Sequence, residues 1–135
     1  IAKLKINGTY SLSEDKRFID KLANCDLRVQ ALEYDLIKVI SNEIKGISPG
    51  VEANMLKIRG SEIQQEITEL VLEASGYYAN SIQKNIIEIG MNEPKVGPSW
   101  TSTSAQKYFD MRKTTIYAGS TEIQKNILAK MVLEL

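Results

Sequence analysis

The most informative absences in this sequence are those of histidine and cysteine. Its 135 residues include no histidine and a single cysteine, Cys25. Histidine is the commonest metal ligand and the commonest general base near neutral pH, so its absence argues against a zinc site and against a Ser-His or Cys-His hydrolase. One cysteine excludes an internal disulfide, and we predict no metal site.

An excess of charge of one sign is also missing. The 17 Lys and Arg residues balance the 17 Asp and Glu residues, which gives a formal net charge of zero. This balance argues against a bulk electrostatic attraction to nucleic acid or to an anionic membrane. There is no apolar run long enough to span a bilayer. We therefore expect a soluble chain that binds no nucleic acid and has no membrane span.

Helical periodicity is the strongest pattern that the sequence does contain. A long helix is predicted from about Asp15 to Lys45, because apolar residues at alternating spacings of four and three line one face. Cys25 lies in this stripe, so we interpret it as a core residue and not as a reactive thiol. The predicted buried stripe consists of Phe18, Leu22, Cys25, Val29, Leu32, Leu36 and Val39.

A second helix is predicted to begin at Ser48-Pro49, after Gly46 has ended the first, and to run to about Ser75. Gly60 lies inside this helix at a cost of about 1 kcal/mol relative to Ala, which suggests close approach by another backbone or by a ligand. The predicted buried stripe is Leu56, Ile63, Ile67, Leu70 and Ala74.

The remaining patterns predict shorter helices and one long loop. A short helix is expected over 81–89, and a loop anchored by Trp100 over 90–103. Ser104 is expected to cap a helix from Ala105 to about Tyr117. The last helix is expected to begin at Thr121, with Ile123, Ile127, Leu128, Met131 and Leu135 facing inward.

Together these segments predict an all-α fold, an antiparallel up-and-down four-helix bundle, with residues 1–135 forming a single domain. The first residue is Ile and not Met, and residues 1–6 resemble the end of a helix that begins elsewhere. We therefore expect this chain to be a fragment of a longer protein.

The turn between the last two predicted helices carries the candidate site. Gly119 suits the positive φ of a helix end, and Ser120 or Thr121 can cap the next helix. Thr121 with Gln124 fits a capping box, and Glu122 lies in the first turn, where the helix dipole favours negative charge. Such a helix start can hold a carbonyl oxygen or an anionic cofactor group. An ordinary turn between two helices is the alternative.

The segment around this turn resembles a known family signature. IYAGSTEIQKNILAK, at Ile116–Lys130, is similar to the C-terminal signature of flavin-dependent acyl-CoA dehydrogenases. The resemblance extends back over about residues 15–135 and is closest to bacterial branches. Its other matching segments are Leu56–Gln65, Asn92–Pro94, Gly97–Pro98, Tyr108–Phe109 and Arg112–Thr114.

The resemblance implies a reaction and a cofactor. In this family a carboxylate removes the α-proton of an acyl-CoA thioester while the β-hydrogen leaves as hydride to FAD, which gives the trans-2-enoyl-CoA. By analogy, Ser120, Thr121 and Glu122 are expected to contact the flavin, and Ala118 and Gly119 to border the acyl thioester. The resemblance also implies an electron-transfer flavoprotein as electron acceptor, assembly into an oligomer of dehydrogenase subunits, and a cytoplasmic location.

Two departures from the family pattern concern function. Many members carry a catalytic Glu directly before the signature glycine, but this chain has Ala118 there, so we assign it no catalytic residue. The family turn Q-x-x-G-G-x-G, which lies against the adenosine end of FAD in a neighbouring subunit, corresponds to Glu73, Gly76, Tyr77 and Ala79 here. Glu73 and Gly76 are the candidate contacts, and Gly76 is the one glycine retained.

Three interpretations follow from the missing glutamate. The base can come from a helix that precedes Ile1, in which case the full-length protein is an active FAD-dependent dehydrogenase and the 135-residue chain alone is inactive. The parent can instead be the base-less subunit of a heteromeric dehydrogenase, or the chain can be a purely structural oligomerisation bundle. The acyl or steroid substrate and the choice between homomeric and heteromeric assembly stay open.

Overall fold

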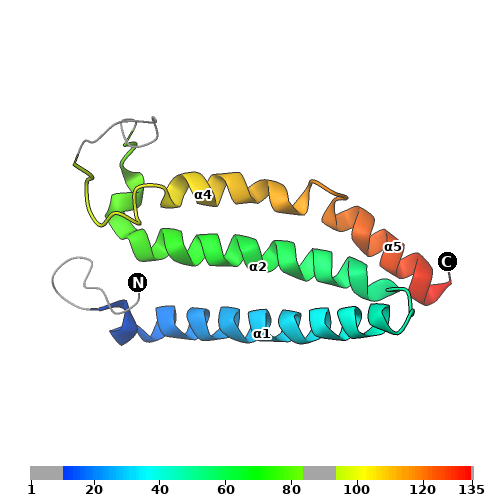
Figure 1. The fold of residues 1–135 in the computed structure, drawn as a ribbon. Coiled ribbons are helices and arrows are strands. Elements are labelled where there is room, and N and C mark those ends of the chain that lie inside the picture. Colours follow the sequence, from blue (N-terminus) through cyan, green and yellow to red (C-terminus); the bar gives the residue numbers. More distant parts are fainter. Residues whose placement is uncertain (1–10, 84–93, 135) are drawn as a thin grey trace. The chain divides into compact units, whose positions relative to one another are not determined.

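All regular secondary structure that the structure describes is helical. The structure, a computed structural model, describes residues 11–83 and 94–134. No β-strand occurs in these two ranges, so the all-α prediction is confirmed, whereas the up-and-down arrangement of a four-helix bundle stays a prediction. The elements, drawn in Figure 1, are η1 (Leu12–Glu14), α1 (Lys16–Ile44), α2 (Val51–Ser75), η2 (Gly76–Asn80), α4 (Ser104–Asp110), η3 (Met111–Thr115) and α5 (Thr121–Leu133), where η marks a 3₁₀ helix.

The two long helices agree closely with the periodicity. α1 ends one residue before the predicted Lys45, and Gly46 follows with a φ of +76°. α2 begins at Val51, two residues after the predicted first helical position, and ends at Ser75 as predicted. Ser48 and Pro49 therefore belong to the connection and do not start the helix.

The helix predicted from Ala105 to about Tyr117 differs from the structure in its start and its regularity. α4 begins at Ser104 itself, whose hydroxyl donates to the Thr101 carbonyl at 2.8 Å, and Thr103 is the N-cap. After Asp110 the chain continues as the 3₁₀ helix η3. Most of the helix predicted over 81–89 and the first part of the predicted loop lie outside the described residues, as do residues 1–10; 81–83 are not helical.

Contacts between Cα atoms divide the chain into two compact units. The described residues of the first unit lie within Ile1–Leu22 and Ile67–Met111, and those of the second within Ala23–Glu66 and Arg112–Leu135. Whether residues 1–135 form one domain stays a prediction.

In the first unit, the start of α1 lies beside the end of α2. Lys21 and Glu73 form an ion pair with a shortest distance of 2.8 Å, and α4 contacts η2. The connection after η2 is held by Gln83, whose side-chain amide exchanges two hydrogen bonds of 3.0 Å with the backbone of Val96. Trp100 is half-buried, and its buried indole Nε1 has no hydrogen-bond partner in the described part of the chain. The buried apolar residues here are Phe18, Leu70 and Ala74.

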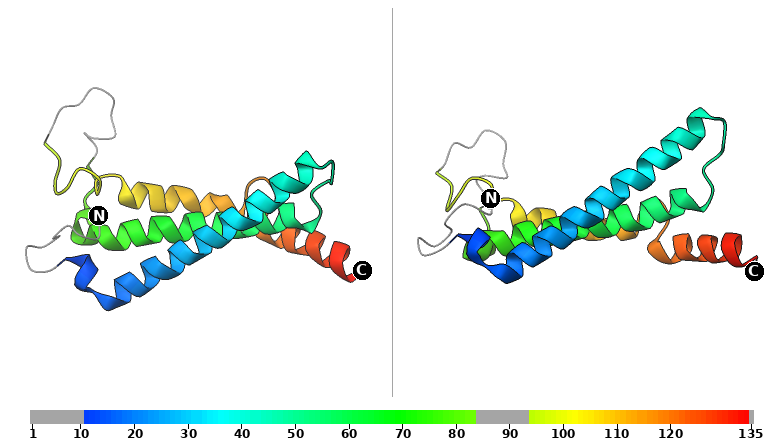
Figure 2. Two further views of the ribbon diagram at one scale, coloured as in Figure 1. Left: turned by 60° about the horizontal axis from the view of Figure 1, so that its bottom comes forward. Right: turned by 90° about the horizontal axis from the view of Figure 1, so that it is seen from below.

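In the second unit, α1 and α2 run side by side in opposite directions, as Figures 1 and 2 show. Arg28 pairs with Glu62 at 3.2 Å and also with Glu66, and Arg59 pairs with Asp35 at 2.7 Å. Asp35 lies seven residues after Arg28 on α1, and its partner Arg59 lies seven residues before Glu66 on α2. This is the register of an antiparallel pair. These ion pairs are exposed, so each contributes little to stability.

The core contains part of each predicted stripe. Phe18, Cys25 and Val39 of α1 are buried as predicted, whereas Leu22 and Leu36 are exposed. In α2, Ile63, Leu70 and Ala74 are buried, Ile67 is exposed, and Ile58 and Ser61 are buried although the pattern did not predict it. Burial raises the pKa of the Cys25 thiol, which fits its place in the core.

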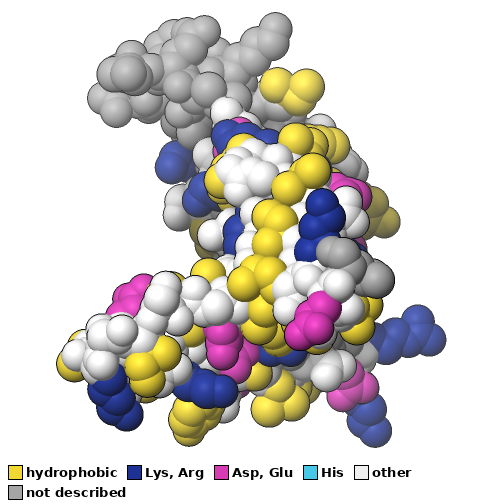
Figure 3. All heavy atoms as spheres, turned by 90° about the vertical axis from the view of Figure 1, so that its right-hand side faces the viewer, with side chains coloured by type: hydrophobic (Ala, Val, Ile, Leu, Met, Phe, Trp, Pro, Cys, Tyr) yellow, Lys and Arg dark blue, Asp and Glu magenta, His cyan; other side chains and the backbone are white. Residues whose placement is uncertain are grey.

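The inward face predicted for the last helix is wrong for Ile123, Ile127 and Met131, whereas Leu128 is half-buried and Leu135 lies outside the described residues. Ile123 and Met131 of α5 are each 53% exposed, and Val132 and Leu133 are exposed as well. Figure 3 shows one face of the molecule on which hydrophobic side chains reach the surface among charged ones. None of the helices in the two described ranges has a stretch long and apolar enough to cross a bilayer.

The sequence led us to expect a close neighbour at Gly60, but packing does not require a glycine at this position. A Cβ atom added there would meet Leu32 Cδ2 at 3.8 Å, an ordinary van der Waals distance. Gly60→Ala should therefore stabilise the chain by about 1 kcal/mol, through the better helix propensity of Ala. The measurement is the midpoint of urea unfolding at an unchanged slope.

The matched control for that change is Gly46→Ala in the same unit. Gly46 has a φ of +76° with open space around it, so a methyl group there meets only backbone strain. We expect this variant to lose about 1 kcal/mol. Equal shifts in both variants, or a loss at Gly60, would contradict this account of the two glycines.

Candidate functional site

The candidate site is a sharp turn in the second unit between η3 and α5. The backbone N–H groups of Ile116 and Tyr117 both donate to the Lys113 carbonyl, at 2.9 and 3.1 Å. Ala118 and Gly119 then adopt left-handed φ angles of +55° and +87° in the bend that precedes α5. Glycine was predicted to supply this conformation. The left-handed Ala118 was not, and such a conformation costs an L-residue roughly 1–2 kcal/mol.

Ser120 caps the helix that follows this turn. Its backbone is extended, and its hydroxyl accepts a hydrogen bond from the Ile123 N–H at 3.4 Å. The predicted capping box between Thr121 and Gln124 is wrong: the Gln124 side-chain amide donates to the Ala118 carbonyl at 3.5 Å, and the Thr121 hydroxyl to the Thr115 carbonyl at 3.5 Å. The cap and the turn are thus held by local hydrogen bonds.

Glu122 is an exposed carboxylate in the first turn of α5. Its own backbone N–H and the Ser120 hydroxyl hold its pKa below the ordinary value for glutamate, and the charges of Lys125 and Lys57 act in the same direction. A lowered pKa makes the carboxylate a weaker proton acceptor. Glu122 therefore has the electrostatics of a capping residue and not of a general base.

Side chains of α2 bind the backbone just before the turn, and sequence reasoning missed them. We call Lys57, Ser61 and Gln65 the polar seam; they lie four residues apart along one face of α2. The Lys57 ammonium donates to the Thr114 carbonyl at 3.0 Å, and the Gln65 amide to the Arg112 carbonyl at 3.2 Å. The spacing of the three polar residues is a sequence signal for one shared face, but it does not reveal this contact.

The second set of predicted cofactor residues lies in the first unit. Glu73 is engaged by Lys21, whose ammonium donates to both carboxylate oxygens at 2.8 and 2.9 Å. Gly76 has a φ of +53°, and the Tyr77 side chain is exposed. Ser120, Thr121 and Glu122 belong to the second unit with Ala118 and Gly119. These five candidates are consecutive in the sequence and form one turn and helix start.

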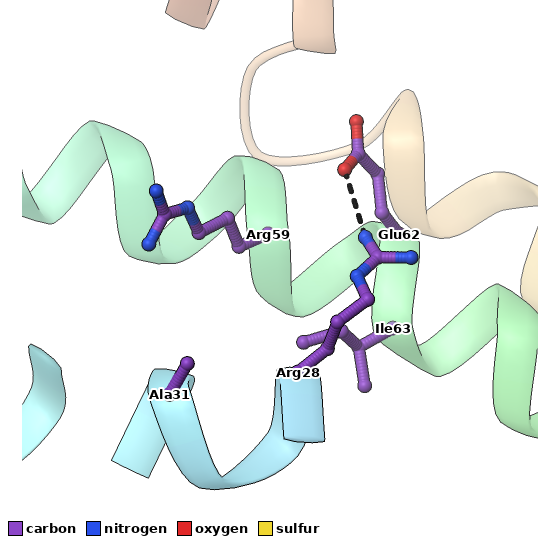
Figure 4. A pocket seen from close by; sticks show the side chains of 5 residues that line it. All are labelled: Arg28, Ala31, Arg59, Glu62 and Ile63. Atoms are coloured by element: carbon purple, nitrogen blue, oxygen red, sulfur yellow. Dashed lines mark hydrogen bonds and ion pairs between the residues drawn. The ribbon is translucent and has the colours of Figure 1, made fainter. Parts of the chain in front are cut away.

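A separate hollow of about 340 Å³ lies in the second unit between α1 and α2. Figure 4 shows Arg28 and Ala31 reaching it from α1, and Arg59, Glu62 and Ile63 from α2. Both arginines are already paired with carboxylates, and the hollow contains none of the predicted site residues. Within 11–83 and 94–134, no group of three or more His, Cys, Asp or Glu side chains could hold a metal ion.

Comparison with protein families identifies one relationship. The family described as "Acyl-CoA dehydrogenase, C-terminal domain" matches residues 5–133, which is nearly the whole chain and includes the turn and the polar seam. The comparisons with curated proteins and with solved structures gave no match.

The capping role of Glu122 predicts a pH-dependent property of the turn. Because the pKa of this carboxylate is lowered in the folded chain, its contribution to stability is present above the pKa of an unfolded glutamate and is lost as the pH falls through the lowered value. Ser120→Ala removes one of the two main causes and should raise the pKa of Glu122.

The measurement is a carbon-detected NMR titration of the Glu122 carboxylate in the wild type and in Ser120→Ala. Ser102→Ala, which removes a hydroxyl bonded to the Ser99 carbonyl in the first unit, is the control and should leave the Glu122 pKa unchanged. Identical titration midpoints in all three proteins would refute the role assigned to Ser120.

Proposed function

The chain belongs to the family of acyl-CoA dehydrogenase C-terminal domains, and on that premise we propose that it lines part of the flavin and thioester site of an FAD-dependent enzyme. The reaction is the α,β-desaturation of an acyl-CoA thioester. The observation that carries this proposal is the Ala118–Gly119 turn, which ends at a Ser120-capped helix start. In the signature, this turn is the segment that borders both ligands.

The side chains of the turn are small, which leaves room for a flavin and an acyl thioester beside it. Ala118 is exposed and presents only a methyl group, and Gly119 presents none. The hydroxyls of Ser120 and Thr121 take part in local hydrogen bonds, so they hold the helix start in place. When bound, FAD supplies the hydride acceptor.

The turn supplies no base for removal of the α-proton. Ala118 has no proton acceptor, and the lowered pKa and capping contacts of Glu122 oppose that role. We therefore propose that the base comes from a part of the full-length dehydrogenase outside this chain. In the alternative, a heteromeric enzyme, the base comes from a partner subunit.

Exposed apolar side chains on α5 support a second part of the proposal, assembly with other parts of a dehydrogenase. Ile123, Met131, Val132 and Leu133 are all more than half exposed. Exposed apolar groups are enriched at protein interfaces. Electron transfer to a flavoprotein acceptor is the further step that the family implies.

Purification of the full-length protein tests the proposed function directly. We expect a yellow protein that oxidises an acyl-CoA, either alone or only after addition of its partner subunit. Activity of the protein alone places the base within the same polypeptide, and activity only with the partner indicates a heteromeric enzyme. A colourless protein without activity in both preparations would leave only a structural role.

A glutamate introduced at position 118 tests more sharply whether the turn borders the acyl thioester. If the Ala118 side chain borders the thioester, Ala118→Glu in the full-length enzyme places a second base against the substrate. In a variant whose own base has been removed, Ala118→Glu should recover activity by at least about tenfold, within the range of general base catalysis. Ala129→Glu, at a half-buried alanine elsewhere on α5, is the control and should recover none.

The capping assignment of Glu122 predicts a mild kinetic effect. Glu122→Gln keeps the size of the side chain and removes its charge, so turnover should stay within about tenfold of the wild type, far from the loss of a general base. Steady-state kinetics of the flavin-loaded enzyme provide the measurement. Loss of nearly all turnover with flavin still bound would show that Glu122 acts in the chemistry.

A further inference from the structure

The chain between α4 and α5 departs from regular α-helix just where the site is formed. η3 is a 3₁₀ helix, and after it Ala118 and Gly119 are left-handed. Carbonyl groups released from an α-helical ladder need other donors, because an unpaired buried carbonyl costs free energy comparable to a lost hydrogen bond. In the second unit, Lys57 and Gln65 of the polar seam supply such donors.

Gln65 is the centre of this arrangement. Its side-chain amide lies 3.2 Å from the Arg112 carbonyl, 3.2 Å from the Thr115 hydroxyl and 3.4 Å from the Thr114 hydroxyl. In the opposite direction, the Arg112 guanidinium donates to the backbone carbonyl of Gln65 at 3.0 Å. One residue of α2 therefore contacts three of the five residues of η3.

The neighbouring contacts are partly or fully buried and continue to the turn. The Thr114 hydroxyl donates to the Ser61 carbonyl at 3.3 Å, and both residues are buried. Lys57 donates to the Thr114 carbonyl, and the Thr115 carbonyl accepts a bond from Thr121, the first residue of α5. A chain of hydrogen bonds thus runs from α2 through η3 to the helix start that carries Ser120 and Glu122.

We propose that Gln65 is a positioning residue for the site: its amide fixes η3 against α2 and so sets where the Ala118–Gly119 turn and the start of α5 lie. Gln65 itself touches no substrate or cofactor in this proposal. An effect of Gln65 on catalysis, the catalytic consequence, rests on the proposed function. Its effect on the position of η3 and the turn, the mechanical consequence, concerns only this chain.

Adjacent glutamines on α2 provide a matched test. Gln65→Glu keeps the shape of the side chain but replaces the donor amide by a carboxylate, and Gln65→Leu removes the donor without adding charge. Gln64→Glu makes the same chemical change one residue earlier, on an exposed side chain. The readout is site-resolved amide hydrogen exchange of the 135-residue chain, compared between 114–123 and the α1 segment 25–39.

Both Gln65 variants should speed exchange over 114–123 by about tenfold or more, the effect expected from a lost hydrogen bond to a partly buried group. Exchange in 25–39 should change by less than about twofold, and Gln64→Glu should match the wild type in both segments. The proposal is overturned if exchange rises equally in both segments, if 114–123 is unaffected, or if Gln64→Glu behaves like the Gln65 variants.

Kinetics of the full-length dehydrogenase separate this inference from the proposed function. If the wild-type enzyme binds flavin and turns over, Gln65→Glu should lower kcat and shift the flavin absorption band, while KM changes far less. Gln64→Glu should have the kcat, KM and flavin spectrum of the wild type. If Gln65→Glu speeds amide exchange over 114–123 but leaves kcat and the flavin spectrum unchanged, Gln65 does not position the site for catalysis. A wild-type protein without flavin or activity would instead refute the proposed function, and the exchange result would then decide the mechanical inference alone.

Discussion

The need of main-chain carbonyls for donors is the constraint on which the candidate site depends. A continuous α-helix from Ser104 to Leu133 would satisfy its own backbone but would have no turn at Ala118. The observed break at η3 creates the turn and leaves carbonyls to be bonded from outside the helix ladder. Lys57 and Gln65 bond two of these carbonyls. The polar face of α2 is therefore as much a part of the site as the signature itself.

Periodicity and end signals predicted the long helices well, because those signals are local. The end of α1 before Gly46, the end of α2 at Ser75 and the cap at Ser120 all depend on residues within one helical turn of the boundary. The family resemblance was confirmed by the match over 5–133. The all-α class follows from the same repeated spacing and needed no tertiary information.

Features that depend on tertiary contacts could not be predicted in this way. Lys57 and Gln65 lie outside the buried stripe predicted for α2, and polar side chains at helical spacing usually contact solvent. Here they face η3, which has no apolar periodicity of its own to reveal the contact. The same limit explains α5: the spacing of Ile123 and Met131 identifies an apolar face, but not what covers it, and both are exposed.

The ion pairs between α1 and α2 reverse their polarity along the second unit. Arg28 on α1 faces Glu66, whereas Asp35, one heptad later, faces Arg59. A hairpin displaced by seven residues in one direction would set Arg28 against Arg59, and in the other direction Asp35 against Glu66. Both misaligned hairpins oppose like charges and are penalised. Salt bridges that add little to the free energy of unfolding can thus still select the native register of the hairpin, because they disfavour the shifted registers.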